Sequence, residues 1–205
     1  HGRRGHLRAA RGTGEARKLV TPAETHAWLT DVLGPMDLLN VNGMTVGVAP
    51  VLPAAVTVGF SEIDSDLVVD DPNADSAGLT EVRCEIICAA DGATPQQRVM
   101  AVAGAWNTLV NAGIPGQPGT ALPGLVNDPA LTVHHGLLRE PEIFDRGTPL
   151  VNEPATDNTP ARMTLLLELV LLTDDEYELA EEQGLEVLER RLRRRQTSLG
   201  DWDRE

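Results

Sequence analysis

The densest group of potential metal ligands in this sequence is a run of carboxylates between residues 64 and 75. It consists of Asp64, Asp66, Asp70, Asp71 and Asp75. Oxygen ligands of this kind suit calcium, but the spacing lacks the glycine and the closing glutamate of the helix-loop-helix calcium pattern. We therefore predict a solvated acidic loop over residues 64–78, with no metal bound.

Two thiols are the next candidates for chemistry. Cys84 and Cys88 are the only cysteines. If both lie on one strand they are about 13 Å apart, at about 3.3 Å per residue, which is too far for a disulfide. On a helix the same spacing could pair two metal ligands, but no second Cys or His pair follows nearby to complete a site. We expect buried, free thiols.

Two histidines stand side by side at His134 and His135, inside a segment that has the pattern of a strand. Neighbouring residues of a regular strand point to opposite faces, so these two rings should not ligate one metal ion together. We predict a structural or exposed position for each of them.

Familiar catalytic motifs are missing. The segment from Gly59 to Ile63 lacks the second glycine of a nucleophile elbow, and residues 113–124 contain no phosphate-loop G-K-[ST]. Lys18 is the only lysine, so no buried amine is available as a nucleophile. An enzyme could still act through carboxylates such as Glu62 and Glu85, but sequence alone does not place such acids together.

Charge is distributed unevenly along the chain. Residues 19–189 hold 27 acidic and 5 basic residues, while arginines concentrate in residues 1–18 and 190–195. An anionic body repels nucleic acid and acidic membranes and attracts cationic proteins. The longest apolar run, residues 163–172, is half of the roughly 20 residues that a membrane span needs. We expect a soluble cytoplasmic protein that binds neither nucleic acid nor membrane.

The 205 residues suit one domain with a single core. Residues 1–18 are rich in Gly and Arg and show no periodicity, which predicts a flexible basic arm, and residues 19–205 form the domain. Aromatic residues are scarce, so the core should be aliphatic, with few bulky members. These are Trp28, Phe60, Trp106 and Phe144.

Three capping boxes predict where helices begin, because a Thr and a Glu or Gln three residues later satisfy each other's backbone donors. They start at Thr21, Thr94 and Thr173. The first helix should end at Gly34 and the second near Asn111, with Val110 among its buried residues. Gly184 should interrupt the third, and a further helix should cover residues 185–195.

Runs rich in β-branched and aliphatic residues predict the strands. They cover residues 46–51, 55–60, 79–90, 131–138 and 163–172. The last run is apolar on both faces, which is typical of a central strand covered on both sides. Segments rich in Gly, Pro and polar residues, at 64–78, 114–129 and 146–160, read as loops. The whole indicates an α+β fold with a central β-sheet and helices packed around it.

Short motifs follow one another in a characteristic order. They are Gly59-Phe60-Ser61, Arg83-Cys84-Glu85-Ile86, a helix near Trp106, His135-Gly136-Leu137-Leu138, Thr173-Asp174-Asp175-Glu176, Gly184, and Asp201-Trp202-Asp203-Arg204. This order resembles the suppressor of fused family over about residues 45–204. The family positions are Gly59, Ser61, Glu85, His135, Thr173, Glu176, Gly184, Asp201 and Arg204. We expect structural roles for them, with Thr173 as a helix cap and Gly184 as a helix break.

The resemblance implies protein binding. Animal members of the family are not enzymes; they bind a transcription factor and take an extended peptide as an added strand. Bacterial relatives are mostly single domains, and some are proposed as immunity proteins. We expect a single-domain member without the second domain of the animal proteins, and the arginine-rich, lysine-poor composition looks bacterial.

We therefore expect an immunity or partner-sequestering protein that needs no cofactor. Its partner would be another protein or peptide, such as a basic toxin domain. The expected contact region is the acidic loop with Asp64, Asp66, Asp70 and Asp71. Two alternatives remain open: an enzyme of unrecognised type with carboxylates in a cleft, and a structural subunit of a complex.

Overall fold

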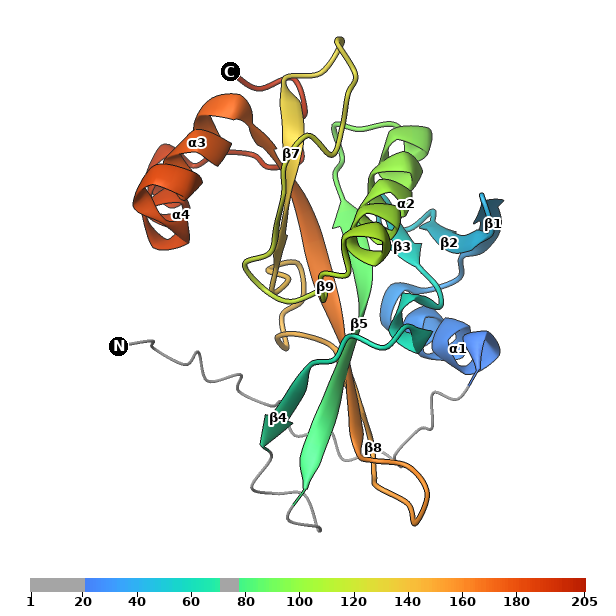
Figure 1. Cartoon of the computed structure of the whole chain (residues 1–205). Coiled ribbons are helices and arrows are strands. Elements are labelled where there is room, and N and C mark those ends of the chain that lie inside the picture. The colour runs from blue at the N-terminus through green and yellow to red at the C-terminus, as the bar shows by residue number, and fades with distance from the viewer. Residues whose placement is uncertain (1–20, 71–77) are drawn as a thin grey trace.

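The structure is a computed structural model that describes residues 21–70 and 78–205. The predicted basic arm and Asp71 lie outside the described residues. The described strands form one mixed sheet in the order β1-β2-β3-β5-β9-β7-β6, with β4 also pairing with β5 and β8 with β9. Four helices pack around the sheet (Figure 1), which confirms the predicted α+β fold.

Two long parallel strands form the centre of the sheet, β5 (Leu79–Ala89) and β9 (Arg162–Thr173). Strand β9 also pairs antiparallel with β7 (Val133–Arg139) and β8 (Leu150–Glu153). The predicted central strand is confirmed, since Leu167 in its middle is fully buried.

Three short strands extend the sheet as an antiparallel meander. They are β1 (Asp37–Val41), β2 (Met44–Ala49) and β3 (Ala54–Thr57). Asn42 and Gly43 have positive φ angles in the two-residue turn before β2, as a tight hairpin requires. The predicted strand over 55–60 ends early, because Phe60–Glu62 forms a 3₁₀ turn, η1. Strand β1 was not predicted.

Alternating side chains of β9 contact different helices, which explains why its sequence is apolar on both faces. Leu167 and its odd-numbered neighbours share a core with α2 (Pro95–Ala112). Leu166 packs with α1 (Pro22–Leu33), and Leu172 packs with α3 (Asp174–Gln183) and α4 (Leu185–Arg195). Figure 1 shows the α3–α4 pair beside β7, away from α1 and α2.

All three predicted capping boxes are present, with reciprocal contacts at Thr21, Thr94 and Thr173. Gly184 separates α3 from α4 at a φ of 92°, a left-handed value that favours glycine. The prediction that Val110 is buried was wrong: it is 44% exposed, because α2 turns its opposite face to the sheet.

Three further strands lie in segments that were predicted as loops. They are β4 (Val68–Asp70), β6 (Ala121–Leu122) and β8. Each has four residues or fewer and is held by a longer neighbour. Among the helices described, none is long and apolar enough to cross a membrane.

Both thiols are free and buried, as predicted. Burial raises the pKa of Cys88 to about 12 and that of Cys84 further still, so both are poor nucleophiles at neutral pH. Trp28 and Phe60 are in the core as expected, and Trp202, which was not predicted there, is only 2% exposed. Trp106 and Phe144 are half-buried.

Candidate functional site

A buried carboxylate organises the turn between β3 and η1. Glu85 on β5 has no exposed surface, and its oxygens accept five hydrogen bonds. The hydroxyls of Thr57 and Ser61 donate at 2.5 and 2.8 Å, and the backbone N–H groups of Gly59, Phe60 and Ser61 at 2.9, 3.2 and 3.1 Å. Gly59 has a φ of 113°, so the turn also needs glycine there. The family positions Gly59, Ser61 and Glu85 therefore form one contact network.

Burial raises the pKa of Glu85 to about 7, while the hydrogen bonds from Thr57, Ser61 and Gly59 oppose that rise. The groups around the carboxylate are protein donors and none of its surface is open, so in this arrangement it holds the turn and meets no substrate. Glu62, the other carboxylate considered for catalysis, is exposed.

The turn carries the chain across a gap in the sheet. On its outer side β5 pairs with β3 through residues 87–89 and with β4 through residues 79–81, so no strand pairs with it between them. Polar contacts bridge the gap instead. The Ser65 hydroxyl donates to the carbonyl of Val82 at 2.5 Å, the Val82 N–H donates to the carbonyl of Leu67 at 2.9 Å, and the Ile86 N–H donates to the Thr57 hydroxyl at 2.9 Å.

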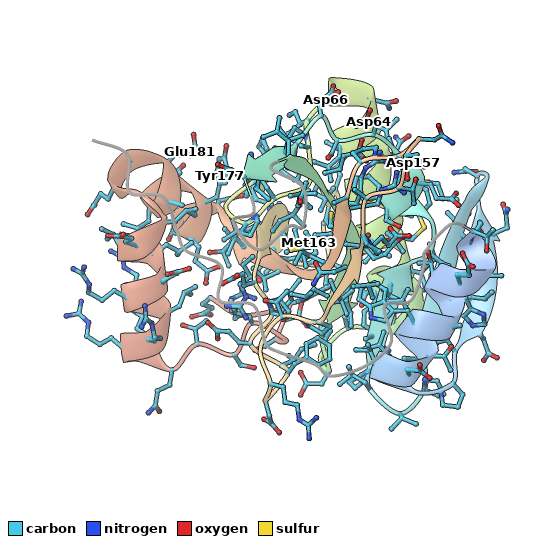
Figure 2. All side chains as sticks on the ribbon, turned by 90° about the horizontal axis from the view of Figure 1, so that it is seen from below. Asp64, Asp66, Asp157, Met163, Tyr177 and Glu181 are labelled. Atoms are coloured by element: carbon cyan, nitrogen blue, oxygen red, sulfur yellow. The ribbon has the colours of Figure 1, made fainter. Side chains whose placement is uncertain are left out.

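The bridging segment leads into a surface that we call the acidic edge, formed by Asp64, Asp66, Val68, Val69 and Asp70. The side chain of Asp64 is 66% exposed, and Val68 and Val69 are 49% and 38% exposed. Within the described residues, β4 pairs with β5 alone. Figure 2, which views this end of the molecule, shows Asp64 and Asp66 on the same side of it. Three of the four predicted contact residues thus belong to one surface.

Arg83 lies beneath the acidic edge and is only 6% exposed. It donates to the carbonyl of Ser61 and to Glu81, each at 3.3 Å, and lies 3.7 Å from Asp64. Asp66 and Asp70 form no ion pair within the described residues. Among the residues described, Asp66 and Asp70 therefore leave negative charge on the edge without a cationic partner.

A second network joins the family positions near the C-terminal end of the sequence. The Arg204 guanidinium donates to both oxygens of Glu176 at 3.0 and 2.8 Å and to the backbone carbonyls of Leu171 and Asp201 at 2.5 and 2.7 Å. Glu176 also accepts from the Thr173 N–H at 2.9 Å. These contacts fasten residues 201–204 onto the junction of β9 and α3.

The prediction that His134 and His135 face opposite sides was wrong. A bulge in the β7–β9 register between Val133 and His135 brings both rings to Asp174, at 3.3 and 2.7 Å from the same carboxylate oxygen. These contacts lower the pKa of Asp174. His135 also accepts from the Gly124 N–H at 3.0 Å and stacks on Tyr177, with 4.3 Å between the ring centres.

The two histidines and one exposed carboxylate do not make a metal site. Within the described residues, no group of three or more His, Cys, Asp or Glu side chains could hold a metal ion. Figure 2 shows Tyr177, on α3, to the left of Asp64 and Asp66, so this cluster and the acidic edge lie on different elements.

No family model matches this chain. No curated protein matches it either. Among solved structures, it is similar to a chain of "the Sufu-Fu complex crystal structure", with 15% identity, coverage of 86% of this chain and 77% of that chain, and a TM-score of 0.45. A likeness this distant identifies no partner, function or site.

Proposed function

We propose that this chain is a protein-binding domain without enzymatic activity, which sequesters a basic partner protein through its acidic edge. The observation that carries the proposal is the combination on that edge of an exposed apolar strand with two carboxylates, Asp66 and Asp70, that lack cationic partners within the described residues. An open strand edge offers backbone donors and acceptors to another chain. Exposed carboxylates beside it favour a cationic partner and raise the rate of encounter.

The charge of the whole domain supports the same partner class. With 27 acidic and 5 basic residues between positions 19 and 189, the domain attracts cations over the distance that salt leaves unscreened. We infer a toxin domain with a basic substrate groove, such as a nuclease, and hence an immunity protein of a bacterium. A cytoplasmic location fits the two free thiols.

The proposal includes membership of the suppressor of fused family as a single-domain protein. Its support is that positions chosen from motif order make direct contacts although they lie far apart in the sequence. Ser61 contacts Glu85, 24 residues away, and Glu176 contacts Arg204, 28 residues away. Both networks hold the fold together, which agrees with the structural roles expected of the family positions.

The test replaces three carboxylates of the acidic edge with amides, as Asp64→Asn, Asp66→Asn and Asp70→Asn together. The binding partner is the protein encoded by the neighbouring gene, and association rates are measured by stopped flow at about 50 mM and about 500 mM salt. We expect the triple variant to associate about tenfold more slowly at low salt. Its melting temperature should change little, because these side chains are exposed.

A charge-matched control separates local from overall charge. Glu178→Gln, Glu181→Gln and Glu182→Gln together remove three exposed carboxylates from α3. This control should slow association much less than the edge variant. Equal association rates for the two triple variants would contradict a role for the acidic edge. A neighbouring gene for a metabolic enzyme, in place of a toxin, would favour the enzymatic alternative.

A further inference from the structure

A small pocket of about 130 Å³ opens beside the acidic edge, between η1 and the end of α2. Three of its lining residues are exposed aliphatic side chains: Ile63 at 38%, Val110 at 44% and Ile114 at 43%. Asp64 and Asp66 also line it. Apolar side chains that gather around a concavity with a polar rim are typical of an interaction site.

The walls of this pocket are fixed by the fold. Gly113 ends α2 with a φ of 63° and turns the chain toward Gly116. The Cys84 thiol donates to the Gly116 carbonyl at 3.6 Å, and a Cβ at Gly116 would lie only 2.7 Å from that sulfur. On the other wall, Phe60 packs edge-on against Trp106 with 5.7 Å between ring centres. A preformed pocket avoids the ordering cost that a flexible one adds to binding.

Arg83 underlies the pocket wall, and one of its hydrogen-bond donors is buried behind that wall. Arg83 lines the pocket, and its Nε–H is buried without an acceptor among the residues that the structure describes. A buried donor without an acceptor is costly, and most such groups in proteins find a partner. The terminal nitrogens of the same guanidinium are already occupied by Ser61 and Glu81.

We propose that this pocket anchors the partner protein by taking one aliphatic side chain from it. The volume is far below the roughly 300 Å³ or more of pockets for whole small molecules, and it suits a single side chain. A flanking Arg or Lys reaches Asp64 and Asp66. This inference rests on the proposed function and adds the chemistry of the segment that is recognised.

The experiment titrates the methyl-labelled protein with short peptides and follows NMR signals. The probes are acetyl-Arg-Leu-Arg-amide, the same peptide with Ala in place of Leu, and the same peptide with Glu in place of both Arg. The leucine peptide should shift the methyl signals of Ile63, Val110 and Ile114. The alanine peptide should bind at least about tenfold more weakly, because it leaves the pocket unfilled.

Two variants test the location. Ile114→Trp blocks the pocket and should abolish the preference for leucine over alanine. Ile143→Trp is the matched control, since Ile143 is 38% exposed and does not line the pocket, and it should retain the preference. Equal binding of the leucine and alanine peptides to the wild type, or an unchanged preference in Ile114→Trp, would overturn the proposal.

The same titrations distinguish this proposal from the proposed function. If the Arg peptide binds better than the Glu peptide but leucine is not preferred to alanine, the acidic edge stands as a binding surface and the pocket proposal is wrong. If the leucine peptide is preferred to the alanine peptide but binds equally well when Glu replaces both Arg, the pocket stands and the acidic edge is not the source of affinity. No shift with any peptide overturns the pocket, while the association test with the whole partner still decides on the edge.

Discussion

Glu85 receives all five of its hydrogen bonds from residues 57–61, a segment 24 or more residues away in the sequence. Burying a carboxylate is costly, and these donors offset much of that cost. When the carboxyl is protonated, the Ser61 hydroxyl can rotate and accept a hydrogen bond from the carboxyl O–H. The site therefore accommodates both protonation states, and both hold the turn that leads to Asp64.

Glu85→Gln tests this arrangement. Whichever way the amide is oriented, its NH₂ group faces donors that lose their acceptor, so we expect a loss of about 2 kcal/mol in unfolding free energy. Chemical denaturation of the wild type and the variant at neutral pH measures it. A variant as stable as the wild type would mean that the five hydrogen bonds contribute nothing net.

The pH dependence gives a second readout of the same variant. Since the pKa of Glu85 is raised from 4.5 to about 7 on folding, the folded state binds the proton more tightly. The stability that proton binding by Glu85 contributes is thus fully present below about pH 4.5 and is lost as the pH rises through about 7. The stability gap between wild type and Glu85→Gln should be larger at pH 5 than at pH 8. The opposite trend would show that the donors hold the carboxylate ionised.

The sequence predicted single residues of the site better than their contacts. The motif order indicated Gly59, Ser61 and Glu85, but their meeting depends on the β3–β5 register, which no local pattern encodes. The free, buried state of the two thiols was predicted correctly, because the alternation of side chains along one strand sets the distance between them. The histidines were not, because the bulge that turns them is set by pairing with β9.

Among the elements, β9 has the largest role, since it pairs with three strands and packs against helices on both faces. Leu167→Asp buries an unpaired carboxylate in its middle and should prevent soluble expression. The control is Leu39→Asp on β1, where the native side chain is 45% exposed. Expression trials of both measure the effect. If Leu167→Asp were soluble and melted at the wild-type temperature, β9 would not be the centre of the core.

Helices were predictable and short strands were not, for one physical reason. A capping box satisfies its backbone groups within four residues, so the sequence at Thr21, Thr94 and Thr173 contains the whole signal. Strands β1, β4, β6 and β8 exist because a longer strand offers them hydrogen bonds. Their own residues are too few to carry a period, and β4 falls in a run that composition marks as a loop.

In the molecule as a whole, the excess acidic charge lowers the stability of the fold but raises the rate of association with a cationic partner. Excess acidic charge repels itself in the compact state, so salt should stabilise this domain. We expect about 1 kcal/mol, or about 2–4 °C in melting temperature, between about 20 and 200 mM sodium chloride. The triple Asp→Asn edge variant should show a smaller rise. A melting temperature that falls with salt would mean that ion pairs such as Arg204–Glu176 outweigh the repulsion.

The negative charge of the acidic edge could be predicted from composition, but the pocket beside it could not. The sequence itself identifies Asp64 and Asp66 as charged, because the charge of a side chain does not depend on its contacts. The pocket requires Arg83 from β5, Val110 from α2 and Ile114 from the segment after α2 to lie together, which only the folded chain shows.

The parallel pairing of β5 with β9 also sets the order of events during synthesis. Glu81 contacts Arg162, 81 residues later in the chain, so β5 leaves the ribosome long before the strand that covers its inner edge. A parallel pair cannot form through a tight hairpin and has to wait for the whole crossover. Until residue 173 is made, the half-sheet of β1, β2, β3 and β5 exposes an apolar edge to other chains. Nascent chains of this protein are therefore most in need of chaperone cover between the emergence of β5 and that of β9.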